Sequence, residues 1–201
     1  MKRVLWLTVL ALALPLTAFA DSVDFTNSGG ILAGSNSGLS LTGSALIAVN
    51  GLNGLGLVTG SNLGSVSFST GALTGSLQMG GTFAAGGSFT ITGNGSSGLP
   101  NGTIFSGTFS GPATWTLVTL ANGTHNYPLT GVVAGTLGSS FYTNGVTVQL
   151  TINTGRGFFN GRTRISSGDT NVVVPEPGSL SLLGTGLLGL AGIVRRKLKV
   201  S

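Results

Sequence analysis

Side chains able to perform acid–base or nucleophilic chemistry are scarce in this sequence of 201 residues. It holds one histidine, four acidic residues and no cysteine. Hydrolysis of a glycosidic bond usually requires two positioned carboxylates, and a Ser-His-Asp arrangement would have to use His125. Asp21, Asp24 and Glu176 lie close to the ends of the chain. A hydrolase or lyase acting on polysaccharide would therefore depend on His125, Asp169 and arginines.

The sequence context of these residues favours a structural role. His125 follows Asn122-Gly123-Thr124, a turn sequence, and we expect it to be an exposed loop residue. The nucleophile-elbow pattern of α/β-hydrolases is absent. Asp169-Thr170-Asn171 could contribute oxygen ligands to calcium, but we interpret it as a capped turn. Because metal sites need clusters of Cys, His and carboxylates, we predict no metal site. The scarcity of reactive side chains also leads us to predict no catalytic residue and no cofactor.

Three arginines and several aromatic residues are candidates for binding carbohydrate. The arginines could bind an acidic polysaccharide, although solubilising charges on a terminal hairpin near the membrane are the favoured interpretation. The aromatic rings could stack on sugars, although core packing is the favoured interpretation for Trp115, Tyr127, Phe141 and Tyr142. The possible glycan contacts are Trp115, Tyr127, Arg156, Arg162 and Arg164.

Alternation of apolar and polar residues predicts β-strands throughout the body of the chain. In residues 146–153 one face is Val, Val, Leu, Ile and the other Thr, Gln, Thr, Asn, which is typical of a half-buried strand. Residues 65–69 and 88–92 alternate in the same way, and helical periodicity is absent. The longest strand candidates are residues 103–109, 113–120, 127–133 and 146–153.

Asn-Gly pairs predict the turns of β-hairpins. A type I′ turn has positive φ at both central residues, and Asn-Gly suits it. Asn122-Gly123 is expected to form a hairpin before residues 127–130, and Asn144-Gly145 another before residues 146–153. Because hairpins imply antiparallel sheets, we predict an all-β body that is an antiparallel β-sandwich or barrel.

A β-solenoid is the alternative architecture. Thr-Gly pairs recur every 15 to 18 residues along the first half of the body, and a fixed period is the signature of a solenoid. The drift of this spacing and the hairpin signals argue against it. The alternative concerns residues 30–95 above all. The part before Gly64 is rich in Gly and Ser and could also be loosely ordered.

The distribution of charge limits the partners. The net charge is +5, but six of the nine basic residues lie at the two ends, and between residues 21 and 177 three arginines face four acids. With no basic stripe to meet phosphates, we exclude nucleic acid as a partner. Residues 25–155 carry no Asp, Glu, Lys or Arg. Since natural sheets use charges to prevent edge-to-edge pairing, we predict self-association or packing against uncharged glycan.

The first 20 residues have the layout of a signal peptide. Lys2-Arg3 form a basic region, residues 5–16 are apolar, and Ala18 and Ala20 form a small-x-small cleavage site. We therefore expect the mature chain to begin at Asp21 and the protein to be exported.

The last residues contain a stiff motif, an apolar segment and a basic cluster, in that order. The motif comprises Val174, Pro175, Glu176, Pro177, Gly178 and Ser179. Residues 179–194 are uncharged and would form a membrane helix about 24 Å long, slightly shorter than a bilayer core of roughly 30 Å. The basic cluster that would stop transfer comprises Arg195, Arg196, Lys197 and Lys199. The prolines keep the motif extended, as a protease cleft requires.

These C-terminal residues resemble the PEP-CTERM sorting signal of Gram-negative bacteria. The resemblance implies processing by exosortase, a membrane protease-transpeptidase. It implies anchoring in the inner membrane before processing, and afterwards a place at the cell surface or outer envelope, or secretion. If the tail were not cleaved, residues 179–194 would be a permanent anchor.

The predicted organisation is a signal peptide at residues 1–20, a Gly/Ser/Thr-rich β domain at residues 21–173 and a sorting signal at residues 174–201. The family that the tail resembles is associated with exopolysaccharide and biofilm. The resemblance therefore implies a protein of the cell surface or extracellular matrix, and the scarcity of reactive side chains predicts that it is non-catalytic. A carbohydrate-binding module and a secreted enzyme acting on polysaccharide are the alternatives.

Overall fold

Antiparallel strands make up more than two thirds of the chain that the structure describes, which is residues 22–138 and 140–173 of a computed structural model. One 3₁₀ helix, η2 (Leu52–Gly54), is also present. The strands are β1 (Ser22–Ser28), β2 (Ile31–Ser35), β3 (Gly38–Asn50), β4 (Val58–Ser69), β5 (Leu73–Ser76), β6 (Gly80–Phe83), β7 (Gly86–Asn94), β8 (Asn101–Phe109), β9 (Ala113–Thr116), β10 (Val118–Thr119), β11 (His125–Leu137), β12 (Ser140–Asn153), β13 (Arg162–Arg164) and β14 (Ser167–Val173).

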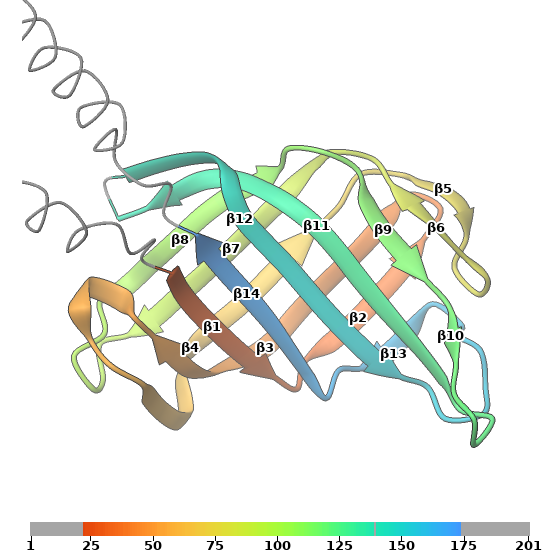
Figure 1. Cartoon of the computed structure of the whole chain (residues 1–201), viewed down its shortest axis with the longest axis horizontal. Coiled ribbons are helices and arrows are strands. Elements are labelled where there is room, and N and C mark those ends of the chain that lie inside the picture. Colours follow the sequence, from red (N-terminus) through yellow and green to blue (C-terminus); the bar gives the residue numbers. More distant parts are fainter. Residues whose placement is uncertain (1–21, 139, 174–201) are drawn as a thin grey trace, which may run out of the picture. The chain divides into compact units, whose positions relative to one another are not determined.

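Eight of these strands close into an antiparallel barrel (Figure 1). Their order is β12-β14-β1-β3-β4-β7-β8-β11, and β11 pairs with β12 to complete the ring. The predicted all-β antiparallel body is therefore confirmed, in the form of a barrel. The eight strands of the ring and the core formed by the described residues lie within residues 22–173, so the ring closes with strands of this segment alone.

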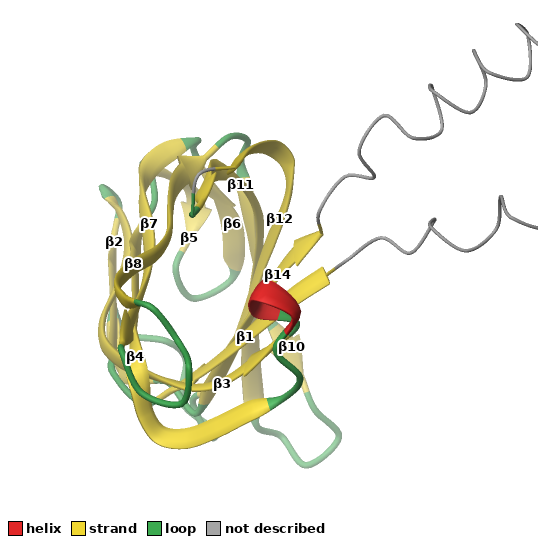
Figure 2. Ribbon diagram, turned by 90° about the vertical axis from the view of Figure 1, so that its left-hand side faces the viewer, coloured by secondary structure: helices red, strands yellow, loops and turns green. Residues whose placement is uncertain are grey.

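The remaining strands extend the barrel wall at two places. β11 pairs with β8 through its second half and with β9 through its first half, and β6 and β5 follow beyond β9. β2 pairs with the first half of β3, and β13 pairs with the other edge of β2. The view in Figure 2 shows the strands curving around a common interior. The solenoid alternative for residues 30–95 is wrong, because neighbouring strands there are antiparallel, and the part before Gly64 is ordered as β1 to β4.

Aromatic and branched side chains fill the barrel interior. Phe68, Phe89 and Phe109 form one cluster, with ring centroids 6.0 to 6.3 Å apart. Such edge-to-face and offset contacts are the favoured geometries of aromatic pairs. The interior also holds a polar pair, since the buried Asn27 side chain donates a 2.7 Å hydrogen bond to Ser44 Oγ.

The hairpin predicted at Asn122-Gly123 is present between β10 and β11. The Leu120 N–H donates to the Thr124 carbonyl at 2.8 Å. In this turn only Gly123 has a positive φ, of 78°. The connection is therefore a longer loop with a left-handed glycine, not the predicted two-residue type I′ turn.

The hairpin predicted at Asn144-Gly145 is wrong. β12 runs continuously through these two residues, and the chain reverses instead near Gly138, whose φ is 58°. The register between β11 and β12 shifts after Val133, where β12 contains the extra residues. A bulge thus accommodates Asn144-Gly145.

Glycines inside strands allow two barrel strands to approach closely. Gly107 of β8 lies opposite Gly135 of β11. A Cβ atom on Gly135 would lie 2.2 Å from the Ser106 carbonyl oxygen and 2.6 Å from the Gly107 Cα. These glycines are required for backbone contact rather than for a turn.

Candidate functional site

His125 is half-buried at the start of β11, so the prediction of an exposed loop histidine is wrong. Its Nδ1 lies 3.1 Å from Thr119 Oγ1. Its ring stacks on Phe158, with centroids 4.6 Å apart and 13° between the planes. The turn ends at Thr124, and the loop after β12 covers the imidazole.

The structure does not bring His125 and Asp169 together. Asp169 lies opposite Gln149 of β12, which lies opposite Thr130 of β11. His125 is five residues before Thr130 and two strands away from Asp169. With about 4.8 Å between strands and about 3.3 Å per residue, the two backbones are roughly 19 Å apart. His125 and Asp169 are therefore too far apart to act together as a catalytic pair.

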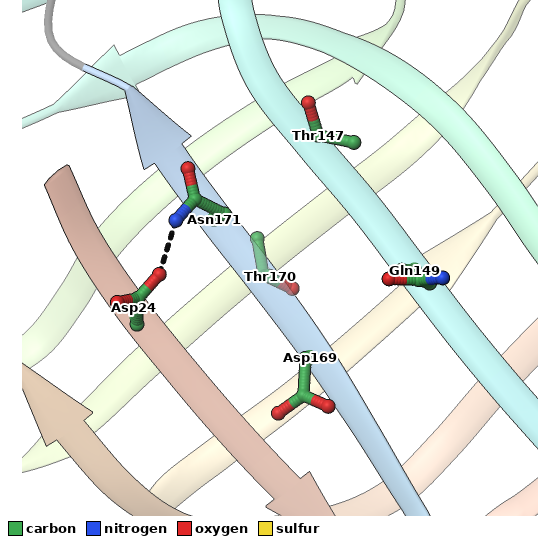
Figure 3. A pocket seen from close by; sticks show the side chains of 6 residues that line it. All are labelled: Asp24, Thr147, Gln149, Asp169, Thr170 and Asn171. Carbon is green, nitrogen blue, oxygen red and sulfur yellow. Dashed lines mark hydrogen bonds between the residues drawn. The ribbon is translucent and has the colours of Figure 1, made fainter.

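Asp169 instead shares an outer face of the barrel with Asp24, and Figure 3 shows this face. Asp24 of β1 lies opposite Asn171 of β14, and the Asn171 amide donates a hydrogen bond to the Asp24 carboxylate. A shallow pocket of about 210 Å³ here is lined by Asp24, Thr147, Gln149, Asp169, Thr170 and Asn171. Asp169-Thr170-Asn171 lies within strand β14, so its interpretation as a capped turn is wrong.

This pocket, which we call the acidic pocket, was not predicted. In the sequence, Asp24 lies near the N-terminus and far from Asp169. The pairing of the first strand with the last one brings it beside Asp169. Carboxylate and amide oxygens are ligands suited to hard cations. Among the described residues, however, no group of three or more His, Cys, Asp or Glu side chains could hold a metal ion.

Trp115 and Tyr127 are core residues, so their assignment as possible glycan contacts is wrong. They are 1% and 0% exposed. The Trp115 Nε1–H donates to the Leu77 carbonyl at 2.9 Å. The Tyr127 hydroxyl donates to the Gln78 carbonyl at 2.8 Å and accepts from the Phe159 N–H at 3.1 Å. Core packing is confirmed for these two. The side chains of Phe141 and Tyr142 are outside the description.

All three arginines are exposed, and they lie away from the point where the chain leaves the barrel. Arg156 is in the loop after β12, and Arg162 and Arg164 are on β13. Ser22 pairs with Val173, so the described chain begins and ends side by side. Figure 1 shows β13 at the opposite end of the barrel. The arginines are therefore distant from both ends of the described chain.

Closure of the ring leaves only short strands as edges among the described strands, and the prediction of self-association rested on exposed edges. Among the described strands, the short edge strands outside the ring are β5, β10 and β13, with 4, 2 and 3 residues. β13 carries two exposed arginines, and short charged edges are protected against pairing.

The predicted signal peptide, with Ala18 and Ala20, and the predicted tail from Val174 onward lie outside the described residues. Within the described ranges, no helix has the length and apolarity needed to cross a bilayer. No curated protein and no protein of solved structure is significantly similar to the chain. The family model of the PEP-CTERM protein-sorting motif matches residues 173–197. The protein therefore carries a PEP-CTERM sorting motif directly after its barrel.

Proposed function

We propose that the protein is an exported, non-catalytic component of the cell surface or extracellular matrix, and that its barrel associates with exopolysaccharide. One observation carries this proposal. The sorting motif matches from residue 173, and the barrel ends with β14 at Val173. The motif implies export, membrane-anchored sorting by exosortase and display at the cell surface. The barrel is then the part that is delivered.

The distribution of reactive side chains supports a non-catalytic role. His125 contacts Thr119 and Phe158, and Asp169 lies roughly 19 Å away by strand spacing. The acidic pocket places Asp24 and Asp169 on one open face, but among its lining residues there is no aromatic ring to stack on a sugar.

The outer face of the barrel supports association with a hydroxyl-rich polymer. Ser65, Ser67 and Ser69 of β4 lie opposite Thr92, Thr90 and Ser88 of β7. Two of these pairs share hydrogen bonds, at 2.7 Å for Ser65 with Thr92 and 3.1 Å for Ser69 with Ser88. A hydroxyl group both donates and accepts, so this uncharged face can exchange hydrogen bonds with the hydroxyls of a glycan.

Intact-mass analysis of the protein from its own host tests the sorting part of the proposal. With exosortase present, we expect a chain that starts near Asp21 and ends near residues 175–178. Without exosortase, we expect the tail to remain. A control with Pro175→Ala and Pro177→Ala should keep the tail in both hosts. A wild-type chain that keeps residues 195–201 in the presence of the enzyme would contradict the proposal.

Fractionation tests the matrix part. The processed barrel should be recovered with the extracellular polysaccharide, and digestion of that polysaccharide should release it. A barrel that stays with the cells after complete digestion of the polysaccharide would contradict matrix association. Activity on polysaccharide that is lost in Asp24→Asn or Asp169→Asn would favour the enzyme alternative.

A further inference from the structure

We infer that the end of the barrel farthest from the sorting motif binds an anionic polysaccharide, with Phe158 as the sugar-stacking ring and Arg156 as the principal cation. This inference rests on the proposed association with polysaccharide and names its chemical class and its site. We call Phe158, His125, Arg156 and the β13 residues Arg162 and Arg164 the distal platform.

The Phe158 ring is a stacking surface with one covered face. Its side chain is 47% exposed. The His125 imidazole lies nearly parallel to the ring, at a centroid distance of 4.6 Å and an angle of 13°. A ring held in this way leaves its other face available to the C–H groups of a sugar, and few side-chain rotamers are lost on binding.

Hydrogen bonds fix the loop that carries the platform. The His125 N–H donates to the Gly155 carbonyl at 2.7 Å, and the Thr154 N–H donates to the His125 carbonyl at 3.0 Å. Thr154 Oγ1 donates to the Gly157 carbonyl at 2.6 Å. These bonds connect the segment before Phe158 to the start of β11, so the stacking ring is positioned before a ligand arrives.

The charges of the described residues point to an anionic ligand. The three arginines all lie within residues 156–164, whereas the two acids, Asp24 and Asp169, lie on the outer face of β1 and β14. Arg156 is two residues before Phe158, and both side chains are exposed. Guanidinium groups form paired hydrogen bonds with carboxylates. A uronate offers a ring for Phe158 and a carboxylate for Arg156.

The platform faces away from the tethered end of the barrel. Val172, next to the sorting motif, lies opposite Val146 of β12. Asn153, at the other end of β12, lies opposite Asn126 beside His125. The seven residue-to-residue steps from Val146 to Asn153 span roughly 23 Å. The platform is therefore at the end of β12 away from the residue where the sorting motif begins.

Binding of the 22–173 segment, which contains the complete barrel, to polygalacturonate tests the inference. We expect binding that weakens as salt is added. Phe158→Ala should weaken it roughly threefold to tenfold, as the loss of one aromatic contact predicts, and Arg156→Gln should also weaken it. Leu57→Ala removes a side chain that is 69% exposed elsewhere and serves as the matched control, which should bind like wild type.

Three results would overturn the inference. One is an equal loss of affinity for polygalacturonate in Phe158→Ala and Leu57→Ala, or no loss of affinity in either variant. Another is equal binding to neutral dextran or to polygalacturonate whose carboxyl groups have been reduced. The third is binding to phosphatidylglycerol vesicles but not to polygalacturonate, which would make the exposed Phe158, Val118 and Leu120 a lipid contact. None of these results would affect exosortase-dependent processing, so a failure here and a failure of the sorting proposal are distinguishable.

Discussion

The indole ring of Trp115 stacks on the phenol ring of Tyr127 inside the barrel, with centroids 5.1 Å apart and 20° between the planes. The polar atoms of both rings donate to carbonyls of the β5–β6 turn, at Leu77 and Gln78. These residues therefore fix that turn against β9 and β11. A ligand outside the barrel cannot reach these two rings, and among the described side chains the exposed aromatic residue near them is Phe158.

Replacement of Tyr127 by Phe should lower the free energy of unfolding by about 1 to 3 kcal/mol, the usual cost of leaving buried polar groups without partners. The hydroxyl group satisfies both the Gln78 carbonyl and the Phe159 N–H. Urea unfolding of the 22–173 segment measures the change. Ser67→Ala, on the outer face of β4, is the control, and we expect it to stay within about 0.5 kcal/mol of wild type. Equal stability of the two variants would refute the bridging role of Tyr127.

Polygalacturonate should leave the fluorescence of Trp115 unchanged. Trp115 is 1% exposed and is the sole tryptophan of residues 22–173, so its emission reports the core alone. We expect emission at the short wavelengths of a buried indole and weak quenching by acrylamide. The Trp115→Ala variant should lose about 3 to 5 kcal/mol of stability. A shift of the wild-type emission on addition of polymer would show that Trp115 takes part in binding, and would contradict this prediction.

Replacement of Gly135 by Ala should destabilise the barrel by about 1 to 3 kcal/mol, the cost of overpacking. The new Cβ would collide with the backbone of Ser106 and Gly107, and neither side can move without opening the pairing of β8 with β11. Gly111 has no neighbour within 4 Å of its would-be Cβ, so Gly111→Ala should be neutral or stabilise by up to about 1 kcal/mol. Equal urea midpoints for the two alanine variants would contradict the steric argument.

Replacement of Ser44 by Ala should cost about 1 to 3 kcal/mol, because it leaves the buried Asn27 amide without its acceptor. Ser44 Oγ accepts from Asn27 Nδ2 at 2.7 Å and donates to the Ser28 carbonyl at 3.1 Å. A double-mutant cycle with Asn27→Ala measures the pair directly. We expect the double variant to lose less unfolding free energy than the two single variants lose together. Strict additivity would show that the two side chains are uncoupled.

The sequence by itself determined the strand-forming body and the sorting tail. Alternation in residues 65–69, 88–92 and 146–153 is a local property of the chain, because side chains on a strand point to alternate faces. The Asn122-Gly123 turn is also a local property of the chain, because its glycine adopts a conformation that few other residues tolerate. The C-terminal motif is a linear signal, and the family model matches it at residues 173–197.

Only the tertiary structure decided which strands meet and which side chains are exposed. β1 pairs with β14 although they are separated by most of the chain, and this pairing closes the barrel and places Asp24 beside Asp169. The burial of Trp115 on β9 depends on how β11 divides its pairing between β8 and β9. Periodicity defines the two faces of a strand, but the order of strands in the barrel determines which residues on those faces become neighbours.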